Sequence, residues 1–114
     1  MSDCLFCKIA DGKIPATIVH QDEDTLAFED INPQAPLHVL VVPRRHIATV
    51  NDLTREDDLV MGKLLRVAAT LARERGCAGT GYRTTLNTNA DGGQLVFHVH
   101  LHVMGGRRMA WPPG

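Results

Sequence analysis

Histidines alternate with apolar residues in the stretch Phe97-His98-Val99-His100-Leu101-His102-Val103. Because successive side chains of a strand point to opposite faces, the three histidines would share one face and the apolar residues the other. We therefore expect a ten-residue strand over 95–104 whose apolar face packs against a helix or the core. Three imidazoles on one face bring polar nitrogens that need partners, which favours a functional site over a plain solvated surface.

Four other short runs have the composition of strands, with turn-forming residues between them. Leu37–Val42 is a β-branched run that ends at Pro43, and it carries His38. The segment Lys13–Ala16 is expected to form a turn or loop. The expected strands cover residues 17–20, 25–29, 37–42 and 82–87.

One long helix is expected between Thr54 and Gly76. Thr54 and Asp57 have the spacing of a capping box, and Gly76 provides a stop. Gly62 costs up to about 1 kcal/mol relative to Ala, which suggests a close packing contact there. Strands that flank one main helix indicate an α+β fold with an antiparallel sheet, in a single domain over residues 1–114. The apolar face of the helix would consist of Met61, Leu64, Leu65, Ala68, Leu71 and Ala72.

The composition excludes several classes of protein. The chain has 114 residues, 44% of them hydrophobic and 22% charged, as in one globular domain. Its net charge of −1 gives no overall positive field for nucleic acid or an anionic membrane. Asp3 and Lys8 interrupt the region where a signal peptide needs an apolar core, and no segment approaches the roughly 20 apolar residues of a spanning helix. We therefore expect a cytoplasmic protein that binds neither nucleic acid nor membrane.

The spacing of the three histidines predicts two different roles. Neighbouring members would lie about 6.6 Å apart along a strand, and the outer two about 13 Å. With Zn–N bonds of about 2.0–2.1 Å, His98 and His102 would not readily share one metal ion, although adjacent members could. The two outer histidines are therefore expected to serve different sites.

A second cluster begins at Cys4 and Cys7, whose spacing is typical of two thiolates bound to tetrahedral zinc. Two more ligands are then needed, and His46, which follows a turn, is a candidate beside one histidine of the strand. A redox pair is less favoured, because no helix start is evident between the two cysteines. Three cysteines are too few for a disulfide framework, and Cys77 has the position of a small buried side chain.

The loop before the histidine stretch, residues 87–94, contains Gly92 and Gly93. Two consecutive glycines let backbone N–H groups approach an anion closely, although they also occur in ordinary hairpin connections. Placed directly before three histidines, the loop is expected to form an anion cradle. A histidine could then attack phosphorus while a second titratable group protonates the leaving group. Loop N–H groups rather than Mg²⁺ would stabilise the charge, since no acidic cluster stands near the motif.

Together these residues resemble the histidine-triad (HIT) family, specifically its Hint branch. The family signature is H-x-H-x-H followed by two apolar residues, which His98–Met104 fits. The resemblance implies a HIT-like α+β fold with a short N-terminal helix, and a homodimer whose two sheets join. It also implies hydrolysis of the P–N bond of purine nucleoside 5′-phosphoramidates through a nucleotidyl-histidine intermediate. Further similar stretches follow the same order along nearly the whole chain, at residues 13–16, 30–36, 91–94, 105–107 and 111–114.

The resemblance also implies roles for individual residues. His100 would be the nucleophile, His38 would support it, and His102 would lie beside the phosphate. Asp30 would hold the ribose hydroxyls, and Trp111 would lie in a tail that crosses the dimer toward the partner's leaving-group pocket. The remaining implied residues surround the phosphate (Asn87, Gly93, Gln94), the base (Phe6, Ile14, Ile31, Leu40) and a structural zinc ion (Cys4, Cys7, His46, His98).

The chain differs from the family pattern at two positions. Leu95 stands where well-known Hint proteins have a phosphate-facing Ser, and Glu29 stands where a His is frequent. The Leu removes one hydrogen bond to the phosphate. On the residues alone, three other functions stay open: a catalytic zinc enzyme that uses two adjacent triad histidines, a nucleotide-binding regulatory module with little turnover, and a dinucleoside polyphosphate hydrolase.

Overall fold

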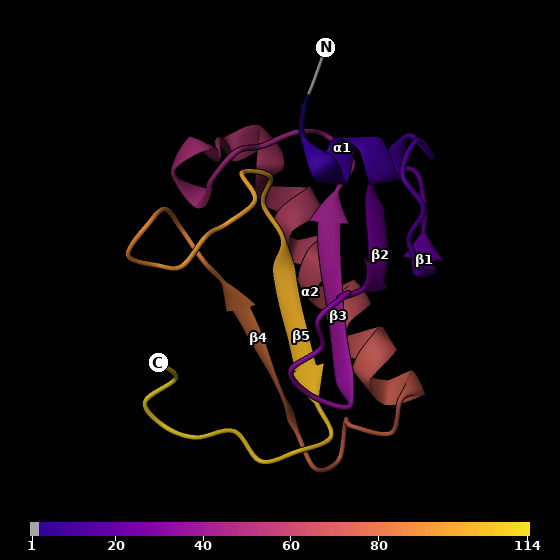
Figure 1. Ribbon diagram of the computed structural model, residues 1–114, viewed down its shortest axis with the longest axis vertical. Helices are drawn as coiled ribbons and strands as arrows, with labels where there is room; N and C mark the ends of the chain where they lie inside the picture. The colour runs from indigo at the N-terminus through magenta and orange to yellow at the C-terminus, as the bar shows by residue number, and fades with distance from the viewer. Residues whose placement is uncertain (1–2) are drawn as a thin grey trace.

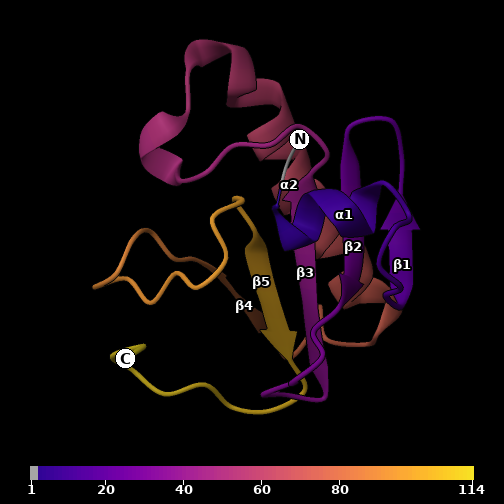
Figure 2. The same cartoon turned by 45° about the horizontal axis from the view of Figure 1, so that its top comes forward.

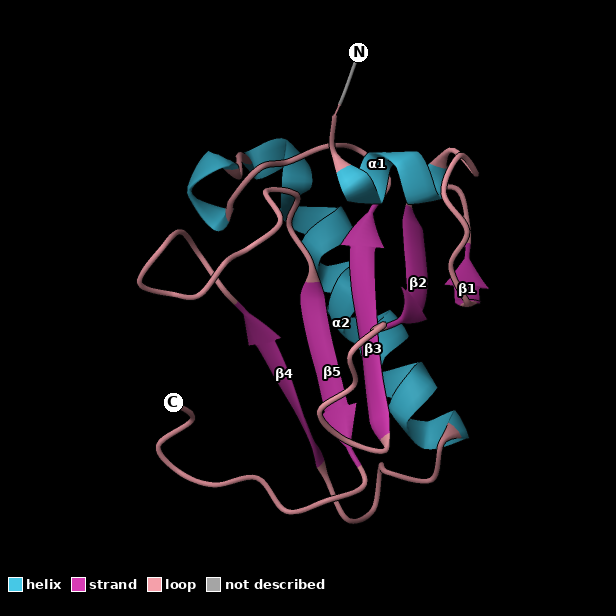
Figure 3. Ribbon diagram, in the orientation of Figure 1, coloured by secondary structure: helices cyan, strands magenta, loops and turns pink. Residues whose placement is uncertain are grey.

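The computed structural model, over residues 3–114, contains a five-stranded sheet in which neighbouring strands are antiparallel. The strand order is β1-β2-β3-β5-β4. Residues 3–114 are those that the structure describes, and the first two residues of the predicted domain lie outside them. Figures 1 and 3 show α2 behind the sheet and α1 across one end of it. The elements in chain order are α1 (Leu5–Ala10), β1 (Ile18–Gln21), β2 (Thr25–Glu29), β3 (Leu37–Pro43), the 3-10 turns η1 (Val50–Asp52) and η2 (Arg55–Asp57), α2 (Asp58–Glu74), β4 (Tyr82–Leu86) and β5 (Leu101–Gly105).

Side chains of the sheet alternate between two cores. Val39 and Val41 point toward α2, where they are completely buried. Leu40 points the opposite way and packs with Phe6 of α1. Figure 2 shows the result, with α1 and α2 on opposite faces of the sheet. His38 shares the face of α1 because it lies two residues from Leu40 along β3. The predicted α+β class with an antiparallel sheet is confirmed.

The long helix begins and ends close to the expected residues. Thr54 and Asp57 form the predicted capping box, in which Thr54 N donates to Asp57 Oδ2 at 2.9 Å. The helix is followed by Gly76, whose φ of +78° suits glycine. The predicted apolar face is wrong at Leu65, which is exposed because it lies about 100° round the helix from its buried neighbour, and Val67 packs in the core instead. No helix within residues 3–114 has the length and hydrophobicity that crossing a bilayer requires.

Two smaller expectations concern α2 and the residues that follow it. The expected close contact at Gly62 is wrong, since a Cβ there would meet nothing within 4 Å and the residue is exposed. Cys77 is confirmed as a small buried side chain in the core on the α2 face. Gly105 of β5 approaches it closely, because a Cβ on Gly105 would lie 3.0 Å from Cys77 Sγ.

The strand that carries the histidines is shorter than predicted. β5 covers only Leu101–Gly105, and the residues before it form an irregular segment. This segment bonds to the loop after β3 rather than to a neighbouring strand, since Val99 N donates to Ile47 O at 2.7 Å. The carbonyl oxygen of His98 is also bonded to a side chain rather than to a strand, since it accepts from His100 Nδ1 at 2.8 Å. The predicted ten-residue strand is therefore wrong over residues 95–100.

Candidate active site and metal centre

A cavity of about 810 Å³ lies on the face of the sheet that carries α1. Part of its wall is apolar, where Phe6 packs edge-on against Phe28 with ring centroids 5.3 Å apart. Another part is polar and contains two histidines of the triad together with a carboxylate and an amide. The predicted site residues that line it are Phe6, Ile14, Asp30, Ile31, Leu40, Asn87, Gly93, His100 and His102.

His100 lines this cavity with one ring nitrogen unprotonated. The side chain is buried, and its Nδ1 lies 2.8 Å from the carbonyl oxygen of His98. A carbonyl oxygen can only accept, so Nδ1 carries the proton and Nε2 keeps its lone pair. Burial lowers the pKa of His100, which keeps the ring neutral at pH 7. Nε2 therefore has the electron pair that a nucleophile needs.

His38 and His102 form a hydrogen-bonded pair beside Asp30. Gln34 N donates to His38 Nδ1 at 2.9 Å, so the proton of a neutral His38 sits on Nε2. That Nε2 lies 3.0 Å from His102 Nδ1 and 3.3 Å from Asp30 Oδ2. His38 therefore donates to His102, and the proton of a neutral His102 sits on Nε2.

The surroundings of this pair keep both rings neutral. Burial, assisted by His100 and His38, lowers the pKa of His102 to about 4, with Asp30 acting in the opposite direction. Burial also lowers the pKa of His38, against the charges of Asp30 and Glu29. The rings of His100 and His102 lie with centroids 5.0 Å apart. A lone pair on His100 and an N–H donor on His102 thus occur side by side in one cavity.

The glycine loop before the histidines contributes Asn87 and Gly93 to the cavity. Gly93 has a φ of +83°, and a Cβ on Gly92 would lie 2.5 Å from Thr88 O, so the loop itself requires both glycines. The expected anion cradle is not available from the central amide, since Gly93 N already donates to Ala90 O at 3.0 Å. The Asn87 side chain is the remaining polar group that this loop presents to the cavity.

Gln94, predicted beside the phosphate, is buried beneath the loop and does not line the cavity. Its Oε1 accepts from Asn89 N at 2.9 Å, and its Nε2 donates to Ala48 O at 2.8 Å and to Val96 O at 3.1 Å. The backbone N–H of Gln94 donates to Asn89 O at 3.0 Å. The side chain therefore ties the glycine loop to the segment that follows β3.

Three further positions lie at the edge of the site or away from it. Trp111 is exposed and does not line the cavity within this chain. Glu29 lines the cavity, and its carboxylate pairs with Arg75, which directly follows α2. Leu95 lines the cavity and is strongly exposed.

The apolar wall also contains residues that the sequence patterns did not single out. Ile9 lies three residues after Phe6 on α1, and Phe28 alternates with the buried Leu26 along β2. The helical spacing in α1 and the period of two in β2 are signals that could have indicated them. Neither signal was evident in the sequence, because α1 is only six residues long and β2 only five.

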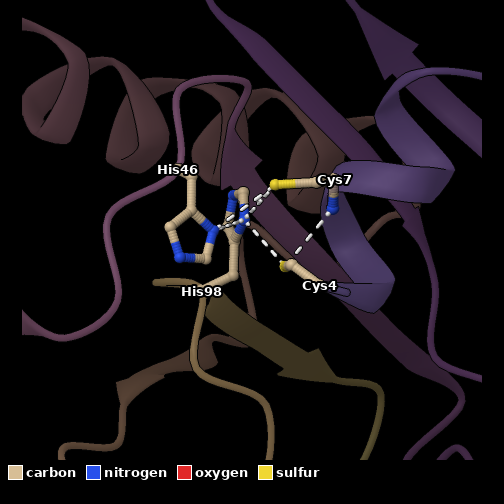
Figure 4. A group of neighbouring side chains, drawn as sticks. All are labelled: Cys4, Cys7, His46 and His98. Carbon is tan, nitrogen blue, oxygen red and sulfur yellow. Dashed lines mark hydrogen bonds between the residues drawn. The ribbon is translucent and has the colours of Figure 1, made fainter. Parts of the chain in front are cut away.

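The predicted zinc ligands come together in one cluster, hereafter the zinc cluster, which Figure 4 shows. His98 Nδ1 lies 3.2 Å from His46 Nδ1 and 3.3 Å from Cys4 Sγ. Cys7 Sγ lies 3.4 Å from His46 Nδ1 and 3.5 Å from His98 Nδ1. Tetrahedral zinc with bonds of about 2.0–2.3 Å needs ligand atoms about 3.3–3.8 Å apart, so two thiols and two imidazoles at these distances fit the ion.

Both ends of the zinc cluster are held in place by the fold. His98 is completely buried, and its Nε2 donates to Pro43 O at 2.8 Å, which turns the lone pair of Nδ1 toward the thiols. The expectation that no helix starts between the cysteines is wrong. α1 begins at Leu5, and Cys4 Sγ accepts from Cys7 N at 3.4 Å. A sulfur cap lacks the oxygen that marks most helix starts, so no pattern indicated it.

Comparisons with known proteins agree along nearly the whole chain. The family model described as "Scavenger mRNA decapping enzyme C-term binding" matches residues 3–110. Purine nucleoside phosphoramidase of Escherichia coli K12 is 47% identical over 105 residues, which are 92% of this chain and 88% of that protein. An uncharacterised HIT-like protein of Synechococcus elongatus is 46% identical over 112 residues, 98% of this chain and 97% of the relative. The crystal structure of a HIT family hydrolase from Legionella pneumophila has a TM-score of 0.96 and 53% identity, covering 98% of this chain and 100% of that one.

Proposed function

Because the chain belongs to the histidine-triad (HIT) family and is a hydrolase, we propose that it cleaves the P–N bond of purine nucleoside 5′-phosphoramidates, such as adenosine 5′-monophosphoramidate. The observation that carries the proposal is the lone pair on His100 Nε2 beside the N–H of His102 in one cavity. The similar Escherichia coli protein, which is named a purine nucleoside phosphoramidase, supports the substrate class.

In the proposed first step, His100 Nε2 attacks phosphorus, a bond forms between them, and the bond from phosphorus to the leaving amine breaks. The electron pair of the broken bond stays on the amine nitrogen, which takes up a proton as it departs. We assign that proton to His102. His102, which is neutral before substrate binds, takes up this additional proton from solvent when the negative phosphate binds beside it and offsets the burial that lowers its pKa. The step releases the amine and leaves a nucleotidyl-histidine.

In the proposed second step, water attacks the same phosphorus and the bond to His100 breaks, which returns the electron pair to Nε2. The now neutral His102 accepts the proton that the water loses. The products of the two steps are a nucleoside monophosphate and an amine. While the nucleotide is attached, the His100 ring carries positive charge, and the hydrogen bond from Nδ1 to the His98 carbonyl oxygen stabilises it.

The wall of the cavity supports an assignment for the rest of the substrate. Phe6, Phe28 and Leu40 form a buried apolar surface suited to the flat face of a purine. Asp30 is assigned to the ribose hydroxyls, because its carboxylate lines the cavity near His38. Asn87 is assigned to the phosphate oxygens, since the neighbouring loop amide is already bonded within the loop.

We also propose that the zinc cluster holds a structural Zn²⁺ ion. When bound, the ion would cross-link α1, the loop after β3 and the segment before β5 through four protein ligands. His98 connects this cluster to the cavity, because its carbonyl oxygen accepts the hydrogen bond from His100 Nδ1. Phe6, between the two cysteines, packs edge-on against His98 and His100 with centroid distances of 6.0 and 5.0 Å. The cluster would thus hold the nucleophile in position.

A homodimer in which two sheets join along β4 is part of the proposal. β4 is the last strand in the sheet order and pairs on one side with β5. Tyr82 and Leu86, at its two ends, are exposed. An edge strand offers N–H and C=O groups to a further strand, and a second copy of β4 would use them.

The proposed function is tested by incubating the protein with an adenosine 5′-phosphoramidate and measuring the release of AMP and amine. We expect wild-type turnover without added Mg²⁺, and loss of turnover with retained AMP binding in His100→Ala. Binding of AMP without any turnover would instead indicate a regulatory module. Preferential cleavage of a diadenosine polyphosphate would indicate a dinucleoside polyphosphate hydrolase.

A further inference from the structure

A hollow of about 660 Å³, hereafter the arginine hollow, lies at the end of the sheet where β4 begins and β5 ends. Tyr82 of β4 pairs with Gly105 of β5, so the segment that enters β4 lies next to the segment that leaves β5 (Figure 1). Residues 80–83 and 106–109 line the hollow from these two segments. None of the described residues lines both this hollow and the cavity of the triad, so the two spaces are distinct.

The arginine hollow gathers positive charge that no carboxylate of residues 3–114 neutralises. Arg83, Arg107 and Arg108 line it, and its described lining residues include no Asp or Glu. Elsewhere a cation such as Arg45 pairs with a carboxylate, that of Asp57 at 3.0 Å. Within residues 3–114, none of the three arginines of the hollow has such a partner. The hollow is therefore positive, although the net charge of the chain is −1.

Backbone carbonyl oxygens hold two of the guanidinium groups in position. Arg83 Nη2 donates to Ala110 O at 2.8 Å. Arg107 Nε donates to Gln34 O at 2.8 Å, and its Nη1 donates to Arg108 O at 3.2 Å. A carbonyl oxygen orients a guanidinium group without cancelling its charge, and each group keeps N–H donors for a further acceptor. Because these side chains are oriented beforehand, a ligand that binds them loses less free energy in ordering them.

We propose that the arginine hollow binds a small oligophosphate, a linear anion with two or three phosphate groups. Planar guanidinium groups match phosphate oxygens and bind them through pairs of parallel hydrogen bonds. Consecutive phosphate groups offer such oxygens to arginines from both segments of the hollow, and they carry denser negative charge than the separate carboxylates of an acidic peptide. The net charge of −1 gives no long-range attraction for a large polyanion, so the ligand is small and held locally.

The inference goes beyond the proposed function and does not depend on it. Two sources could supply the same chemistry, an inorganic oligophosphate or the phosphate tail of a nucleoside triphosphate. Calorimetric titrations of the zinc-loaded protein at low salt therefore use sodium tripolyphosphate, ATP and orthophosphate separately. We expect the wild type to bind one tripolyphosphate per chain, and to bind orthophosphate about tenfold more weakly or worse, because fewer charge-assisted hydrogen bonds form.

The main variant is Arg108→Gln, because the Arg108 guanidinium makes no hydrogen bond within residues 3–114 and its loss should leave the melting temperature unchanged. Its affinity for tripolyphosphate should fall about tenfold, the order of one charge-assisted hydrogen bond. The control is Arg66→Gln, an exposed arginine on α2, which removes the same charge and should keep the wild-type affinity. Any zinc that tripolyphosphate withdraws would affect both variants alike.

ATP distinguishes the two sources. An equal fall in ATP affinity in Arg108→Gln would show that the hollow takes the phosphate tail of a nucleotide, and unchanged ATP affinity would show that it takes the inorganic anion alone. Both results support the proposal.

Three results would overturn it. The first is wild-type protein that binds no tripolyphosphate, or binds orthophosphate equally well. The second is an equal loss of affinity in Arg66→Gln and Arg108→Gln, which would reflect overall charge rather than a site. The third is binding by Leu86→Asp, which alters the β4 edge, without binding by the wild type, which would show that a second copy of the chain covers the hollow.

Discussion

Two main-chain groups determine which nitrogen of each histidine is available for chemistry. The carbonyl oxygen of His98 accepts the proton of His100 Nδ1, and the amide of Gln34 occupies Nδ1 of His38. His38 then donates to His102. The spacing of the triad predicts that the histidines differ in role, but it cannot predict these proton positions. They depend on partners from the turn before β3 and on an irregular backbone, neither of which a period of two reveals.

The half-buried His102 should make the fold sensitive to acid. Its pKa is lowered from 6.5 to about 4, so as the pH falls the unfolded chain binds this proton before the folded one. The effect is absent above pH 6.5 and destabilises the fold progressively as the pH falls from 6.5 toward 4. We expect His102→Gln to lose less free energy of unfolding than the wild type between pH 7 and pH 4.5, measured by urea denaturation.

Both proteins in this comparison should be metal-free, so that protonation of the zinc cluster contributes equally. Identical losses of unfolding free energy in wild type and His102→Gln would show that other groups carry the acid sensitivity.

At the scale of elements, the sequence predicts best what depends on neighbouring residues. The capping box of η2 directly before α2, the apolar spacing of α2 and the β-branched run of β3 are local patterns, and the structure contains all three elements. The alternation over 95–104 predicts too long a strand, because Val99 bonds to Ile47 in a distant loop. The glycine loop predicts an anion cradle, but its Gly93 amide closes a turn instead. In the first case the deciding hydrogen bond comes from a distant loop, and in the second it closes within the glycine loop itself, between Gly93 and Ala90.

Two glycine substitutions should change stability in opposite directions. Gly62→Ala adds a Cβ on the exposed side of α2, where it meets nothing within 4 Å, so we expect it to stabilise the protein by about 0.5–1 kcal/mol. Gly92→Ala adds a Cβ 2.5 Å from Thr88 O and should destabilise the glycine loop. Urea denaturation of the two variants checks the signs. Destabilisation by Gly62→Ala would reveal a packing contact in solution that the fold described above does not contain.

Loss of one thiol should remove zinc and weaken catalysis together. We expect Cys7→Ser to lose the bound metal and to melt at a lower temperature, because the cluster would cross-link three segments. Turnover should fall by roughly 10- to 100-fold, since His98 both belongs to the cluster and orients His100. The control is Cys77→Ala, a buried cysteine in the other core, which should retain zinc. Full metal content in Cys7→Ser, measured by metal analysis, would remove that thiol from the site.

At the scale of the whole molecule, the larger core and the candidate site lie on opposite faces of the sheet. One face is covered by α2 and forms the larger core, while the other carries the cavity, α1 and the zinc cluster (Figures 1 and 2). The edge at β4 belongs to neither face and supports the proposed contact between two copies. The sequence patterns indicate two faces through the alternation over residues 97–103, whereas the joining of sheets is implied only by the family resemblance.

A negative charge introduced on β4 should dissociate the proposed homodimer. We expect the wild type to sediment as a dimer and Leu86→Asp to sediment as a folded monomer, because a carboxylate at the join loses its hydration without gaining a partner. The control Leu59→Asp places the same charge on α2 and should remain dimeric. A wild type that sediments as a monomer at all concentrations would contradict the proposed join along β4.

The central claim is that His100 forms a covalent bond to the phosphorus of the nucleotide. It is tested most directly by mixing the enzyme with an adenosine 5′-phosphoramidate, stopping the reaction within the first turnover in alkaline denaturant, and mapping the modified peptide by mass spectrometry. The account predicts one adenylyl group on His100 in the wild type and none in His100→Ala. An adenylyl group on His102, or rapid turnover by the wild type with no labelled histidine at any time point, would contradict it.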